Sequence, residues 1–171
     1  MKRIVALTVT MFLLAVLPAL AQTAKLGYVD LQKALNMSSA GQSAKAQIGE
    51  RVKEYEGEVQ SRQAELKKMK EDLEKQAVLL SEEARGRKER EYQQKLKEFQ
   101  RFTKDIQEEL QQKDADATRR ILEELFGVIE KYGADNGFTM IFEKTESSVL
   151  YADDRVDLTE DIIKAYDAQN K

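Results

Sequence analysis

The chain has 171 residues, of which 28 are basic and 31 are acidic, so its formal net charge at neutral pH is −3. It contains no histidine and no cysteine, which excludes imidazole and thiol catalysis and the usual zinc-ligand sets. An acidic balance argues against nucleic acid as a partner, because phosphate binding relies on clustered lysine and arginine. A glycine-rich phosphate loop is also absent, and we therefore predict neither an enzyme nor a bound metal or cofactor.

Residues 1–21 are typical of a secretory signal peptide. Lys2 and Arg3 precede an apolar stretch over residues 4–17, and a small-residue cleavage pattern ends at Ala21. The apolar stretch is shorter than the roughly 20 residues that span a bilayer. We expect cleavage between Ala21 and Gln22, which leaves a soluble chain with 26 basic and 31 acidic residues and a net charge of −5.

Residues 22–43 form the first part of a predicted body. Residues 25–30 alternate as in a short strand, with Leu26, Tyr28 and Val29 as buried candidates. Asp30 is placed to cap a short helix that follows. Ser39 with Gln42 three residues later matches a capping box, which would start a long helix.

Two heptad stripes dominate residues 44–132. The first stripe, at alternating spacings of four and three, consists of Ile48, Val52, Tyr55, Val59, Arg62, Leu66, Met69, Leu73, Gln76 and Leu80. The second consists of Tyr92, Leu96, Phe99, Thr103, Ile106, Leu110, Lys113, Ala117, Ile121, Leu125, Val128 and Tyr132. Their average period of about 3.5 residues keeps one seam toward a partner helix, and the extra step after Ala117 reads as a stutter.

Between the stripes the pattern breaks. Ser81 can cap a new helix with Glu82 and Glu83 in its first turn, and Gly86 weakens helix by roughly 1 kcal/mol relative to alanine. These features favour an antiparallel helical hairpin with its tip near residues 77–87. One continuous helix is the alternative.

Residues 133–171 form the second part of the body. Asn136-Gly137 is typical of a helix stop, and residues 138–142 and 149–152 are expected to pair as a strand hairpin before a last helix. The fold class is therefore α+β, mostly α, with a long antiparallel coiled-coil hairpin inserted between short strands. Because so few strands make a marginal sheet, we expect the small β body to be completed in a closed homo-oligomer.

The order of these parts resembles the Skp/OmpH family of periplasmic chaperones. The resemblance rests on "KLGYVDLQKAL" after the cleavage site, on the charged hairpin, and on "GFTMIFEKTESSVLYADDRVDLTEDIIKAY" near the C-terminus. It implies a periplasmic trimer with a small β-barrel body and three arms around a cavity. Such a trimer would hold unfolded outer-membrane proteins without ATP before membrane insertion. The best-known members are strongly basic whereas this mature chain is acidic, so we transfer no lipopolysaccharide-binding residues.

Two sets of arm residues are candidate contacts. Met69, Tyr92, Phe99 and Phe102 could grip an unfolded client, although a heptad stripe is more often the seam between two helices. Phe102 lies off the stripe and could point outward.

A basic cluster occupies the predicted tip. Arg85, Arg87, Lys88 and Arg90 could touch an anionic membrane surface or acidic client segments, or could form an ordinary solvated helix end among interleaved glutamates.

Two functions remain open from the sequence. The first is an ATP-independent holdase whose several arms bind one client by many weak contacts. The second is a structural or tethering coiled coil of the cell envelope that binds a folded partner or a lipid surface. The two end motifs favour the chaperone.

Overall fold

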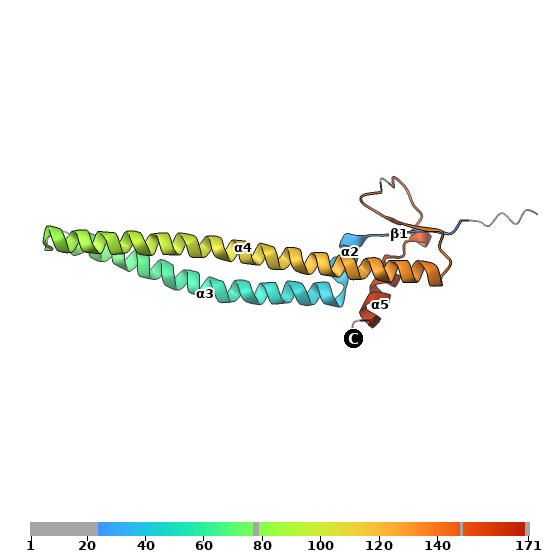
Figure 1. The fold of residues 1–171 in the computed structure, drawn as a ribbon, viewed down its shortest axis with the longest axis horizontal. Helices are drawn as coiled ribbons and strands as arrows, with labels where there is room; N and C mark the ends of the chain where they lie inside the picture. The colour runs from blue at the N-terminus through green and yellow to red at the C-terminus, as the bar shows by residue number, and fades with distance from the viewer. Residues whose placement is uncertain (1–23, 77–78, 148, 170–171) are drawn as a thin grey trace, which may run out of the picture.

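A long helical arm extends from a small body (Figure 1). The computed structural model describes residues 24–76, 79–147 and 149–169, so the expected signal peptide and its cleavage point lie outside the described residues. Within the described ranges, no helix has an apolar stretch long enough for a membrane span.

The arm consists of two helices that run antiparallel. Helix α3 (Ser39–Gln76) and helix α4 (Glu82–Asp135) have 38 and 54 residues, or about 57 and 81 Å at 1.5 Å per residue. Ser81 caps α4, because its Oγ accepts a hydrogen bond from the backbone N–H of Ala84 at 3.3 Å. The expected hairpin is confirmed, and the alternative of one continuous helix is wrong.

The heptad stripes form the seam between these helices. Every position of the first stripe is buried or half-buried, and in the second stripe only Lys113 is exposed. Leu66, with 9% of its surface exposed, is the most deeply buried side chain of the distal seam. The seam stays half-buried because the arm is only two helices thick.

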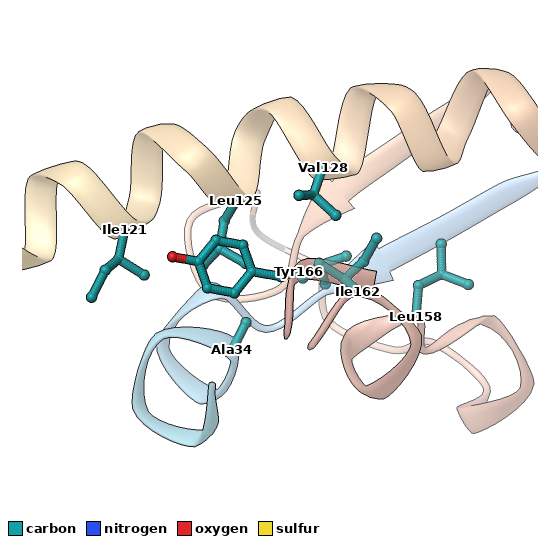
Figure 2. Close-up of a cluster of buried hydrophobic side chains, with 8 residues drawn as sticks. Ala34, Ile121, Leu125, Val128, Leu158, Ile162 and Tyr166 are labelled. Atoms are coloured by element: carbon teal, nitrogen blue, oxygen red, sulfur yellow. The ribbon is translucent and has the colours of Figure 1, made fainter. Parts of the chain in front are cut away.

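The core of the molecule lies in the body, around the last turns of α4 (Figure 2). Helices α2 (Leu31–Met37) and α5 (Thr159–Gln169) pack there against α4. The buried cluster consists of Val29, Ala34, Ile121, Leu125, Val128, Leu158, Ile162 and Tyr166. The hydroxyl of Tyr166 donates a 2.5 Å hydrogen bond to Glu124 on α4, and burial together with this bond raises the pKa of Tyr166.

The sheet joins a strand near the start of the described chain to a strand that follows α4. Strand β1 (Leu26–Val29) pairs in parallel with strand β2 (Met140–Glu143), with Leu26 opposite Met140 and Val29 opposite Glu143. A single parallel bridge also links Tyr28 to Asp157, just after the 3₁₀ turn η1 (Asp154–Val156). The expected pairing of residues 138–142 with 149–152 does not form, because residues 149–152 adopt no strand. Those residues find no strand partner in the described chain.

Local signals fix most element ends. Asp30 caps α2 by accepting a 2.8 Å hydrogen bond from the backbone N–H of Lys33. Gly137 has a φ of 68°, a left-handed conformation that glycine adopts without steric cost, and it follows α4 as expected. Gly27 is required for a different reason, since a Cβ there would collide with the side chain of Leu158.

Two local expectations were wrong. Ser38, rather than Ser39, accepts the hydrogen bond at the start of α3, from the backbone N–H of Gly41 at 3.2 Å. Ser38 is the residue with extended backbone, as a capping position requires. Leu26 is exposed, although Tyr28 and Val29 of the same strand are buried as expected for a core strand.

Candidate functional site

The arm carries an aromatic cluster at its middle. The ring of Phe102 on α4 meets the ring of Tyr55 on α3 edge to face, with 6.2 Å between centroids and an interplanar angle of 79°. The Arg62 guanidinium of α3 lies 4.0 Å from the Phe102 ring centre, within the range of a cation–π contact. Phe102 is therefore a seam residue, and it is half-buried rather than directed into solvent.

The other three client-contact candidates also lie in the seam. Met69, Tyr92 and Phe99 are each half-buried. Phe99 lines a narrow gap between the helices together with Arg62 and Leu66. Each of these side chains thus contributes to the seam and keeps part of its surface accessible.

A polar cluster lies next to the aromatic one. The Tyr55 hydroxyl donates a 2.5 Å hydrogen bond to Glu109 Oε2 on the facing helix, and Arg51 Nε lies 3.4 Å from Glu109 Oε1. The hydrogen bond from Tyr55 lowers the pKa of Glu109, and the same bond, with burial, raises the pKa of Tyr55. This cluster links α3 to α4 by polar contacts. Of its three residues, only Tyr55 belongs to a heptad stripe.

The basic residues of the tip are engaged mainly along their own helix. Arg85 Nε lies 2.8 Å from Glu89, and Arg87 Nη1 lies 2.9 Å from Glu83. Lys88 crosses the hairpin to donate a 3.0 Å hydrogen bond to the side-chain oxygen of Gln76. Arg90 makes no ion pair with any residue that the structure describes. Exposed ion pairs of this kind contribute little to stability and can exchange partners readily.

The sequence patterns missed the apolar surface that the body leaves uncovered. Leu150 is fully exposed and Tyr151 nearly so, both in the connection between β2 and η1. Leu26 and Met140, which are paired across the sheet, are also about half exposed. The sequence predicts a strand pairing for residues 149–152, and it carries no signal for the exposure of Leu150 and Tyr151. These side chains are candidates for contacts with another molecule, because large exposed apolar patches are uncommon on monomeric proteins.

The comparisons with known proteins agree with this architecture. The family described as outer membrane protein (OmpH-like) matches residues 25–166. The crystal structure of a candidate outer membrane chaperone (OmpH-like) from Caulobacter crescentus CB15 superimposes with a TM-score of 0.78. That superposition covers 85% of this chain and 85% of the other, at 18% sequence identity. None of the curated proteins matches the chain.

The family match spans β1, both arm helices, β2 and most of α5, so it includes the arm and the body together. The chain belongs to the OmpH-like family of outer membrane proteins.

Proposed function

We propose that this protein is an ATP-independent periplasmic holdase, which binds unfolded outer-membrane proteins between its arms and prevents their aggregation before membrane insertion. The observation that carries the proposal is the arm itself. Its seam is mostly apolar and only half-buried, while its outer faces carry exposed ion pairs between residues four positions apart. Such a surface offers many weak contacts, which suits clients of varied sequence.

Affinity in this mechanism comes from several arms acting on one client. Each contact is weak, but tethering the arms to one body raises the effective concentration of the next contact. Weak individual contacts also let the client leave when an insertion machine or its own folding removes it. No nucleotide is needed for either step.

The proposed assembly is a homotrimer held together by the bodies. A two-stranded sheet is marginal by itself, and β2 is hydrogen-bonded on one side only within the described chain. Met140 of β2, and Leu150 and Tyr151 of the connection that follows, supply exposed apolar surface. Contacts between copies would bury this surface and protect the strand edge.

The client contacts that we propose are the accessible edges of Met69, Tyr92, Phe99 and Phe102. Partial exposure lets these seam residues touch aliphatic side chains without leaving the seam. For Phe102 the Arg62 guanidinium covers one face of the ring, and displacing it would expose that face. We also propose that the tip residues Arg85, Arg87, Lys88 and Arg90 make transient contact with anionic membrane surfaces.

Light scattering coupled to size-exclusion chromatography tests the function. The mature protein is run alone and after a denatured outer-membrane β-barrel protein has been diluted into it. We expect a defined oligomer that takes the barrel protein into a soluble complex and leaves folded proteins unbound. If the barrel protein aggregates while the oligomer stays free, the holdase proposal fails and the tethering coiled coil becomes the leading account.

The tip proposal has its own test. All four basic residues are changed to glutamine, and binding to liposomes containing an anionic lipid is measured at low and physiological salt. Binding that falls most at low salt supports the contact. Binding that does not change contradicts it.

A further inference from the structure

An open groove lies between α3 and α4 at the base of the arm, next to the body. Its volume is about 830 Å³. One wall is formed by α3 from Ala40 to Arg51, and the other by α4 from Lys113 to Glu123. Sites that bind small ligands commonly have volumes of roughly 300–1,000 Å³.

Small apolar side chains line most of the floor of the groove, and Ile48 is the larger apolar side chain in its lining. Ala44 and Ala117 line it, and both also line a second, smaller groove of about 170 Å³. The preceding position of the α4 stripe is Lys113, which is exposed. Alanine side chains are too short to bridge the two helices, so an apolar floor remains accessible.

The dimensions of the groove suit an extended chain. Ala40 to Arg51 spans eleven helical steps, which is about 16 Å at 1.5 Å per residue. An extended segment rises about 3.3 Å per residue, so about five residues fit along the wall. Ser43 and Gln47 lie on the same wall, where Gln47 Nε2 donates a 3.2 Å hydrogen bond to Ser43 Oγ. These two groups can instead bond to the backbone of a bound peptide.

The charges at the rim favour an anionic group. Arg51 and Arg119 are both engaged in ion pairs. Lys113 approaches a carboxylate only at 3.9 Å, and Arg120 makes no ion pair with the residues that the structure describes. Of the two carboxylates that line the groove, Asp116 pairs with Arg119, and Glu123 makes no ion pair with the residues that the structure describes. The lining side chains thus comprise four bases and two carboxylates, and the Arg120 guanidinium is available to a ligand carboxylate.

We propose that this groove binds a short extended segment of unfolded polypeptide in which small aliphatic side chains alternate with acidic ones. The aliphatic side chains would lie on the floor at Ala44 and Ala117, and an acidic side chain would meet Lys113 and Arg120. Alternation suits the site because successive side chains of an extended chain point to opposite faces. The inference rests on the proposed holdase function and assigns it a specific subsite.

The test uses fluorescence anisotropy with a short labelled peptide in which valine and aspartate alternate, and a matched peptide with lysine in place of aspartate. Ala117→Leu fills the floor of the groove, and Arg120→Glu reverses the charge at its rim. The matched controls are Ala64→Leu and Lys53→Glu, which make the same changes at exposed positions of α3. Thermal unfolding and light scattering are measured for every variant.

We expect the wild-type protein to bind the aspartate peptide more tightly than the lysine peptide. Ala117→Leu and Arg120→Glu should each weaken binding of the aspartate peptide by about tenfold, and the two controls should not. The thermal midpoint of Ala117→Leu should be unchanged or raised, because leucine fills space at a seam position. A variant that binds less while remaining as stable supports a binding groove rather than a packing defect.

Three results would overturn the inference. They are wild-type protein that does not bind the aspartate peptide, an Ala117→Leu variant that binds it normally, and an Ala117→Leu variant with an altered assembly mass. The last result would show that another copy of the chain fills the groove. If the wild-type protein still keeps the denatured barrel protein soluble, these results remove the subsite and leave the holdase function intact.

Discussion

Replacing Leu66 by alanine tests whether the half-buried seam holds the arm together. Leu66 is 9% exposed and lies between Arg62 and Met69 in the first stripe, far from the core of the body. The change removes the equivalent of three methylene groups from a nearly buried position. At about 0.8 kcal/mol for each, the transfer loss is roughly 2 kcal/mol.

The cost of a cavity should add little to that figure. A cavity is expensive when the surroundings cannot relax, as in a closed core. The seam at Leu66 is open on both sides, so the neighbouring side chains and water can fill the space. We therefore expect a destabilisation of the arm near roughly 2 kcal/mol, at the lower end of the range for leucine-to-alanine changes.

Hydrogen exchange measured by mass spectrometry is the suitable assay, because it reports arm opening separately from body unfolding. A loss of roughly 2 kcal/mol should speed exchange in arm peptides by about 30-fold, with body peptides unaffected. Leu79→Ala is the control, since Leu79 lies at the tip and is 84% exposed. Equal exchange in the two variants would refute the view that the seam stabilises the arm.

Four further outcomes are expected. Tyr55→Phe should speed arm exchange less than Leu66→Ala does, because it removes one hydrogen bond to Glu109 and leaves the ring in place. Because the folded-state pKa of Glu109 is lowered, this carboxylate stabilises the arm at any pH above the ordinary glutamate pKa of about 4.3. That stabilisation is lost as the pH falls through the folded-state pKa of Glu109. Lowering the pH should therefore speed hydrogen exchange in arm peptides less in Tyr55→Phe than in the wild-type protein. An identical pH response in both proteins would contradict a stabilising role for the bond between Tyr55 and Glu109. Leu125→Ala should destabilise the body by roughly 2–5 kcal/mol in chemical denaturation, since Leu125 is fully buried in the core. Serine at both Leu150 and Tyr151 should reduce the assembly mass in light scattering, and an unchanged mass would exclude these residues from the interface.

The hairpin could be predicted because its signals are local. A stripe with a period near 3.5 residues specifies which side of a helix is buried, whatever the partner is. The caps at Asp30 and Ser81 and the stop at Gly137 also depend on neighbours within a few positions. These features need no knowledge of distant contacts, and all of them are present in the structure.

The sheet could not be predicted in the same way. Residues 149–152 have the composition of a strand, but strand formation depends on a partner that local sequence does not specify. In this chain β2 pairs instead with β1, more than one hundred residues earlier. Parallel pairing of segments so far apart leaves no turn signal between them.

Phe102 lies off the heptad stripe, yet its ring lies in the seam between the two helices. A heptad count locates backbone positions, whereas a large ring can reach the seam from beside it. Tyr55 and Arg62 meet that ring from the facing helix, because both have side chains long enough to cross the gap.

The stutter in α4 explains how one helix serves both the arm and the body. Up to Leu110 the stripe follows the coiled-coil period and faces α3. The added step after Ala117 moves the apolar stripe around the helix, as an insertion of four residues does in a coiled coil. From Ile121 onward the same stripe is buried under α2 and α5, with Leu125 in the centre of the core (Figure 2). The open groove lies at this change of partner, because its α4 wall runs from Lys113, in the arm seam, to Glu123, beyond the first core residue Ile121.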